Sequence, residues 1–136
     1  MPPELAKELR FLPPIPKGMR RLSADVEVAG VWYRLSSAKS FASGQDQELR
    51  FELEPNNERD DNAIKVIGVY TWCFVKWSVH IGYVPSALAK EIAEKGFAEV
   101  IEPRLRNIWW GGYVQDKIII RFDILGPQEP KNIARK

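Results

Sequence analysis

Side-chain amides and carboxylates are concentrated in the segment EPNNERDDNAI, residues 54–64. Five Asn and Asp residues fall within seven positions of this segment, and an apolar, strand-like run follows. Such side chains close tight turns by hydrogen bonding to their own backbone. When a loop has more of them than a turn needs, they can instead bind a phosphate, a sugar hydroxyl or a base edge. The segment is therefore interpreted in two ways, as an ordinary turn and as a binding site.

Catalysis and metal binding find little support in the rest of the sequence. The chain has one histidine, His80, and one cysteine, Cys73. A hydrolase triad needs a nucleophile paired with a base, and a zinc site needs about four Cys or His ligands. The carboxylates of Glu58, Asp60 and Asp61 do not follow the spacing of a calcium loop, and the glycine-rich loop of nucleotide hydrolases is absent. The sequence predicts a protein that is not an enzyme and needs no metal or cofactor.

Aromatic residues are more numerous than a small barrel usually buries. Rings exposed at a groove stack on unpaired bases, which is worth about 1–3 kcal/mol per base. Trp72 and Phe74 lie within an apolar run and are expected in the core. Tyr33 and the turn at residues 109–113, which ends at Tyr113, lie beside glycines and polar residues. For these rings, core packing and an exposed binding role both stay open.

Charge and composition restrict the class of partner. The chain carries 20 Lys and Arg against 18 Asp and Glu, a net charge of +2, which is too balanced for a protein that coats nucleic acid with its whole surface. Any nucleic-acid site must therefore be local. A single cysteine excludes an intrachain disulfide, no apolar run approaches about 18 residues, and the N-terminal residues lack the apolar region of a secretion signal. These features predict a soluble, cytoplasmic protein without a membrane partner.

Hydrophobic periodicity divides the chain into an arm, one domain and a tail. Residues 1–22 contain five prolines and predict an irregular arm outside the barrel, with one helical turn near residues 4–10. Residues 23–126 form the predicted domain, and residues 127–136 form a basic tail. Strands are expected near residues 25–28, 48–54, 63–70, 72–83, 98–107 and 117–125. The run at 72–83 is interpreted as one or two strands, with a break near residues 77–78.

The same alternation predicts the side chains that face the core. They are Leu49, Phe51, Leu53, Ile64, Val66, Ile118, Ile120, Phe122 and Ile124. One helix is expected at residues 85–95, with Ser86 as its N-cap and Gly96 at its end. Because no βαβ rhythm is present, the pattern favours a mainly β fold, a small closed or half-closed six-stranded barrel with one main short helix.

Three ordered motifs resemble those of the HIRAN domain family. The residues PNN at 55–57, followed by DDNAIKV at 60–66, resemble the central motif of the family. The segment VAGVWY at 28–33 resembles the opening strand of that family, and IGYVP at 81–85 resembles the segment that leads into its helix. Together the motifs cover about residues 25–125. The resemblance implies a β-barrel related to OB and SH3-like folds.

The resemblance also implies a function, the binding of single-stranded DNA at its 3′ end. In such a site, aromatic rings hold the last bases, and the polar loop bonds the terminal hydroxyl and a nearby phosphate. Arg34 and Arg59 stand where the family has aromatic residues, and arginine can both stack and reach phosphate. The residues expected to bind nucleic acid are Tyr33, Arg34, Asn56, Asn57, Arg59, Asp60 and Tyr113.

Two kinds of partner follow from these readings. Single-stranded DNA or DNA ends would place the protein in DNA repair, beside a helicase or a nuclease. The alternative is a protein-interaction barrel that binds peptides and has no affinity for nucleic acid. The sequence leaves the natural ligand and the oligomeric state open.

Overall fold

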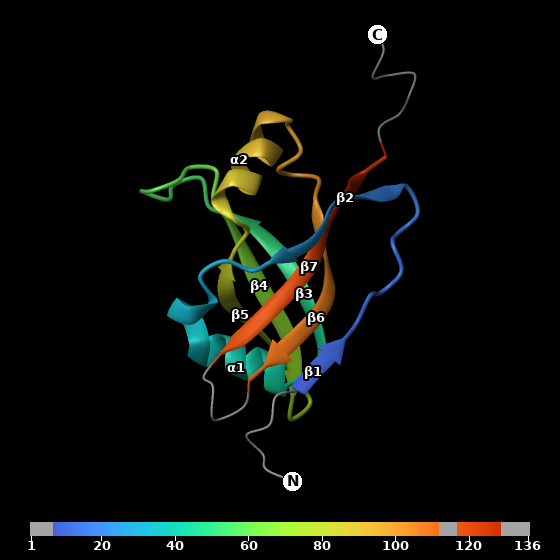
Figure 1. Cartoon of the computed structure of the whole chain (residues 1–136), viewed down its shortest axis with the longest axis vertical. Coiled ribbons are helices and arrows are strands. Elements are labelled where there is room, and N and C mark those ends of the chain that lie inside the picture. Colours follow the sequence, from blue (N-terminus) through green and yellow to red (C-terminus); the bar gives the residue numbers. More distant parts are fainter. Residues whose placement is uncertain (1–6, 112–116, 129–136) are drawn as a thin grey trace.

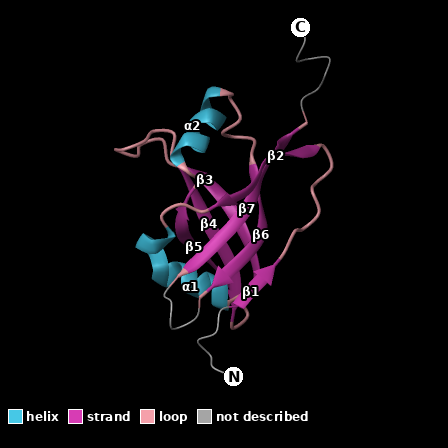
Figure 2. Cartoon of the chain, in the orientation of Figure 1, coloured by secondary structure: helices cyan, strands magenta, loops and turns pink. Residues whose placement is uncertain are grey.

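The computed structural model describes residues 7–111 and 117–128 of the 136-residue chain. The fold is mainly β, as the alternation predicts, with two antiparallel sheets that share one core (Figure 1). Helices lie near the two ends of the strands (Figure 2). The predicted barrel is not confirmed, because the hydrogen-bonded strands of the described residues form two separate sheets. These residues include seven strands instead of the six expected.

The four-stranded sheet has the order β1, β6, β7, β2. Its strands are β1 (Lys7–Arg10), β6 (Glu102–Trp110), β7 (Ile118–Pro127) and β2 (Met19–Glu27). Alternate side chains of β7 face the core, because alternate residues of a strand face opposite sides of a sheet. These are Ile118, Ile120, Phe122 and Ile124, all at 5% exposure or less, as the sequence predicts. The intervening Ile119 and Arg121 are only partly buried and line a groove on the outer face.

The three-stranded sheet consists of β3 (Gln45–Leu53), β4 (Ile64–Trp72) and β5 (Val75–Tyr83), with β4 in the middle. Ile64 and Val66 are buried as predicted. A T-shaped contact between Phe51 of β3 and Phe122 of β7, at 5.7 Å between ring centroids, joins the two sheets. A two-residue turn at Cys73 and Phe74 connects β4 to β5. The predicted break near residues 77–78 is therefore wrong, and β5 is continuous.

Two helices and a 3-10 helix cover the ends of the sheets. The segment Ser86–Glu94 forms α2 close to its predicted position, although Pro85 and not Ser86 is the N-cap. The 3-10 helix η1 (Val31–Arg34) and helix α1 (Leu35–Ser43) were not expected. Phe41 of α1 packs over Gly68 of β4, where an added Cβ would approach the ring to 2.7 Å. None of the helices in the described residues is long and apolar enough to cross a membrane.

The segment expected to be an irregular arm contributes two strands. Residues 7–10 form β1, not a helical turn, and β1 pairs with the outer part of β6. Strand β2 begins at Met19, so the predicted boundary at residue 22 falls inside a strand. Both segments become strands because they pair with strands distant in the chain. Their proline-rich local sequence does not favour a strand in either of them.

Three side chains predicted in the core are exposed. Leu53 lies at the end of β3 and is 40% exposed, Trp72 is 59% exposed, and Phe74 projects fully into solvent. Phe41 of α1 covers Tyr70, whose ring it meets edge-on, whereas Trp72 only borders a hollow that α1 also lines. The tip of the β4–β5 hairpin therefore carries uncovered aromatic side chains.

Candidate functional site

The polar loop between β3 and β4 is organised by Asn57. Its Oδ1 accepts hydrogen bonds from the backbone N–H groups of Arg59 at 2.9 Å and Asp60 at 3.0 Å. One carboxylate oxygen of Asp60 accepts the N–H of Asn62 at 2.9 Å. These bonds are the side-chain to backbone turns that Asn and Asp form readily. The turn interpretation of the loop is therefore correct for Asn57 and for one oxygen of Asp60.

Other polar groups of the loop stay available. Asn56 and Arg59 are exposed, and their side chains form no hydrogen bond or ion pair with the described residues. The second carboxylate oxygen of Asp60 is likewise unbonded within residues 7–111 and 117–128. The loop thus presents an amide, a guanidinium and a carboxylate oxygen on a backbone that internal bonds hold in place.

Glu54 connects this loop to the neighbouring strands. Its Oε1 accepts hydrogen bonds from Asn57 Nδ2 at 2.6 Å and from the Tyr83 hydroxyl at 2.9 Å. Its Oε2 lies 3.2 Å from Lys65 Nζ. The Asn57 amide and the Tyr83 hydroxyl, with Lys65 in support, lower the pKa of Glu54 from 4.5 to about 2. A carboxylate with these partners remains charged at every pH near neutrality.

Tyr83 links Glu54 to the 3-10 helix. The guanidinium of Arg34 lies 6.0 Å from the centre of the Tyr83 ring, and His80 meets the same ring edge-on at 4.8 Å. Burial, and then the Glu54 hydrogen bond, raise the pKa of Tyr83. Burial first, and the charge of Arg34 second, lower the pKa of His80, whose Nε2 lies 2.8 Å from the Gly82 carbonyl oxygen. His80 is therefore a structural neighbour of the site and carries little charge at neutral pH.

Two aromatic rings stand on η1 in the open. Tyr33 is 88% exposed and Trp32 is 69% exposed. Both line a cavity of about 410 Å³ whose other wall includes Lys117 and Ile119 of the β7 region. Rings this exposed contribute little to the core, so they are available to stack on a ligand.

The structure brings only some of the predicted site residues together. Arg34 and Asn57 belong to one connected chain of contacts through Tyr83 and Glu54. Tyr33 lines a separate cavity, and no residue of the polar loop is among the described residues that line it. Tyr113 lies outside the described residues.

Several members of this site were missed from the sequence. Glu54 and Tyr83 lie within the quoted motifs, but only the pairing of β4 with β5 and the closure of the loop bring them together. Trp32 lies in the segment VAGVWY at residues 28–33, but it was not among the predicted site residues. Within residues 7–111 and 117–128, no three His, Cys, Asp or Glu side chains gather closely enough to hold a metal ion.

The lowered pKa of Glu54 predicts a loop that loosens in acid. A carboxyl group whose folded pKa is depressed stabilises the fold above its unfolded pKa of 4.5, and this contribution is lost as the pH falls towards about 2. Tyr83→Phe removes one of the two leading hydrogen bonds, so the titration midpoint of Glu54 is expected to rise. NMR titration of the Glu54 side-chain carboxyl measures this midpoint. Tyr33→Phe, which removes a hydroxyl elsewhere, should leave it unchanged, and equal midpoints in both variants would contradict the geometry.

Comparison with known proteins gives one family. The model of the HIRAN domain matches residues 22–95, more than half of the chain. The matched span contains η1, the polar loop and the β4–β5 hairpin. The match confirms the resemblance read from the motifs. No curated protein and no solved structure matches.

Proposed function

The chain belongs to the HIRAN domain family, and on this premise we propose that it binds single-stranded DNA at its 3′-hydroxyl end. HIRAN domains are in general nucleic-acid-binding modules that bind DNA. As a family of binding domains, they fit a protein without catalytic activity. The end-specific part of the proposal rests on the residues of η1 and the polar loop.

The observation that carries the proposal is the connected chain from η1 to the loop. Tyr33 exposes its ring, and the next residue, Arg34, lies over Tyr83. Tyr83 bonds Glu54, and Glu54 bonds Asn57 in the loop. The exposed ring of Tyr33 and the hydrogen-bonding loop therefore lie on either side of the linked side chains of Arg34, Tyr83 and Glu54. Binding of an unpaired terminal nucleotide requires both a stacking ring and hydrogen-bonding groups.

Each group has a definite role in this proposal. The Tyr33 ring stacks on the last base. Asn56 and the second oxygen of Asp60 bond the terminal hydroxyl, which is both a donor and an acceptor and needs a partner of each kind. Arg34 and Arg59, which replace aromatic residues of the family, bind phosphate or stack as planar cations. A helicase or a nuclease that exposes strand ends during DNA repair would be a suitable partner.

A second candidate function is supported by the β4–β5 hairpin. Trp72, Phe74 and Trp77 are all about half exposed or more, and together they form an apolar tip. Such a surface suits a peptide or protein partner. Salt dependence separates the two functions. Two to four phosphate contacts give a slope of roughly −1.4 to −2.8 in log K against log salt, whereas an apolar groove gives almost none.

The decisive experiment compares three ligands of the same base composition. They are a linear strand with a 3′-hydroxyl, the same strand with a 3′-phosphate, and a circular strand. The 3′-hydroxyl strand is expected to bind best, by about tenfold or more, because a hydrogen bond to a charged acceptor is worth roughly 1.5–3 kcal/mol. The 3′-phosphate would bring negative charge against Asp60. Fluorescence anisotropy at low salt measures all three affinities.

Asp60→Asn is the matched variant for this comparison. The amide keeps an oxygen for the Asn62 N–H but removes the charge, so the preference for the hydroxyl over the phosphate should shrink. Equal affinity of the wild-type protein for all three ligands would exclude recognition of the 3′ end and leave general binding of single strands. No affinity for any of them would favour the peptide function.

A further inference from the structure

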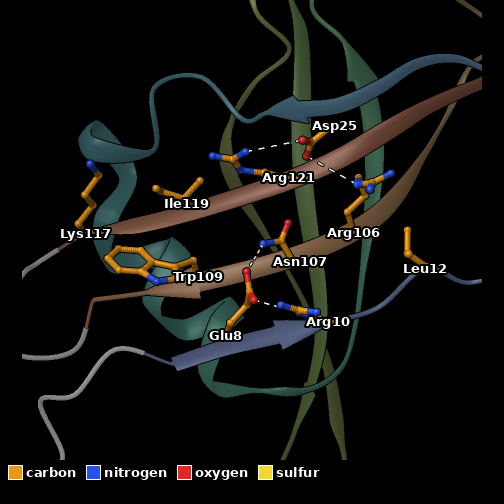
Figure 3. Close-up of a pocket in the computed structure, with 10 residues that line it drawn as sticks. All are labelled: Glu8, Arg10, Leu12, Asp25, Arg106, Asn107, Trp109, Lys117, Ile119 and Arg121. Atoms are coloured by element: carbon orange, nitrogen blue, oxygen red, sulfur yellow. Dashed lines mark hydrogen bonds and ion pairs between the residues drawn. The ribbon is translucent and has the colours of Figure 1, made fainter.

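A second groove lies on the outer face of the four-stranded sheet, where neither the motifs nor the polar loop reach. Figure 3 shows the residues that line it on β1, β6 and β7. Its volume is about 520 Å³. Its walls include Arg10, Arg106, Lys117 and Arg121, against two carboxylates, Glu8 and Asp25. The side chains that line the groove thus carry four positive charges against two negative ones, in a protein whose net charge is only +2.

The four cations differ in how firmly they are held. Arg106 is held most firmly, because its guanidinium donates to the fully buried Asp123 at 3.0 Å. Arg121 lies 3.8 Å from Asp25 and 3.9 Å from Glu27, at the limit of an ion pair. Arg10 pairs with Glu8 at 3.0 Å, but its side chain is 82% exposed. Lys117 is exposed and forms no ion pair with a described residue. Exposed pairs are weak and exchange easily, so Arg10, Lys117 and Arg121 can turn to a ligand.

The wall between these cations carries an aromatic ring. Trp109 of β6 is paired with Ile119 of β7, and both side chains line the groove. Figure 3 places Trp109 between Lys117 and Arg10. A β-bulge in β6 near residues 105–107 lets Arg106 and Asn107 both line this outer groove, because the bulged strand has one residue more than its partner. The result is a groove lined by arginine and lysine side chains with one aromatic platform, an arrangement of the kind that binds single strands.

The groove is continuous with the cavity beside Tyr33. Lys117 and Ile119 line both hollows. Cationic and aromatic side chains therefore lie along one continuous surface. It begins at Tyr33 and Trp32 on η1, passes Lys117 and Trp109, and reaches Arg10 on β1. All the residues named along this surface belong to the described part of the chain.

We propose that this groove holds the nucleotides that precede the bound 3′ end. The strand runs from Tyr33 past Lys117 and across Trp109, where a base stacks, and its phosphates meet Arg121 and Arg10. This inference rests on the proposed function, since it extends the ligand of that site. A single nucleic-acid strand is favoured over an acidic peptide because the groove joins the stacking residues of η1 and has a platform of its own.

Strand length separates the groove from the end site. A 3′-hydroxyl oligonucleotide of about 4 nucleotides should occupy chiefly the Tyr33 site, and one of about 12 should also fill the groove, within the range of 4–16 nucleotides that one small single-strand binding domain covers. Arg10→Glu is expected to weaken the long strand about tenfold, as loss of a charged hydrogen bond predicts, and to leave the short one unchanged. Lys76→Glu changes the net charge equally on the β4–β5 hairpin and is the matched control.

Two further variants test the same path without charge reversal. Arg121→Gln should lower the salt slope of the long strand by about 0.7, the value for one phosphate contact. Lys117→Ala should weaken both strands, because Lys117 lines both hollows. Circular dichroism melts verify that each variant is folded.

The outcomes distinguish the two proposals. One outcome is that the Arg10→Glu and Arg121→Gln variants bind the long strand as tightly as wild type does while Tyr33→Ala weakens binding of both strands. That result overturns the proposal for the groove and leaves the proposal for the end site standing. If the groove variants weaken the long strand while Tyr33→Ala changes nothing, the groove is supported and the end site is overturned. Displacement of the long strand by an equally charged acidic peptide at equal concentration would show an acidic-peptide groove and overturn the strand path.

Discussion

Tyr33→Ala is expected to weaken binding of a 3′-hydroxyl strand by about 1–3 kcal/mol, the value of one stacked base. The ring is 88% exposed, so its removal takes almost nothing from the core. The loss should therefore appear in the dissociation constant and leave the melting temperature as it is. Anisotropy titration with a labelled strand measures the first, and a thermal melt measures the second.

Phe74→Ala is the matched control for this variant. Phe74 is also a fully exposed aromatic ring, but it lies at the tip of the β4–β5 hairpin, away from η1. Its removal is expected to leave the affinity for DNA unchanged. If Phe74→Ala alone loses affinity, the stacking site lies on the hairpin and the assignment to Tyr33 is wrong. If both variants lose affinity equally, stacking is not specific to Tyr33.

Asp123→Ala is expected to lower the free energy of unfolding by about 3–5 kcal/mol, because it removes the buried carboxylate that the partly buried Arg104 and Arg106 share. Asp123 is fully buried on a strand position that alternation would turn outward. Arg104 donates to it at 3.1 Å and Arg106 at 3.0 Å, and the backbone N–H of Asp25 completes its hydrogen bonds at 2.9 Å. Urea denaturation followed by tryptophan fluorescence measures the loss.

Glu91→Ala provides the comparison on the surface. Glu91 pairs with Lys95 at 3.1 Å one helical turn away, and both side chains are more than half exposed. Exposed pairs of this kind contribute only about 0.3–0.5 kcal/mol. A loss of similar size for both variants would show that the Asp123 network is no more important than a surface pair.

Much of the sheet structure was predictable because it repeats locally. The alternation of Ile118, Ile120, Phe122 and Ile124 fixes which face of β7 is buried, and the structure confirms it. The helix at residues 86–94 ends before Gly96, which adopts the positive φ that glycine tolerates. Asx turns in the loop and the three family motifs were also readable from the residues alone, because they depend on near neighbours in the chain.

Helix α1 shows why other elements were missed. Only Ala38, Phe41 and Ala42 of this short helix are buried, and serines surround them. So few apolar positions give a weak helical period. The helix gains its stability from Phe41 packing against Gly68 and Tyr70, a contact that exists only once β4 is in place.

The sequence by itself determined the β class, the core positions at the starts of β4 and β7, the turns of the polar loop and the family. Tertiary structure alone decided that residues 7–10 pair with β6, that Trp72 and Phe74 stay exposed, and that Glu54 meets Tyr83. It also decided that Arg10 and Lys117 border one groove. The physical reason is range. Alternation, capping and turn chemistry act over a few residues, whereas burial and the meeting of charges depend on strands distant in the chain that only the completed sheets bring together.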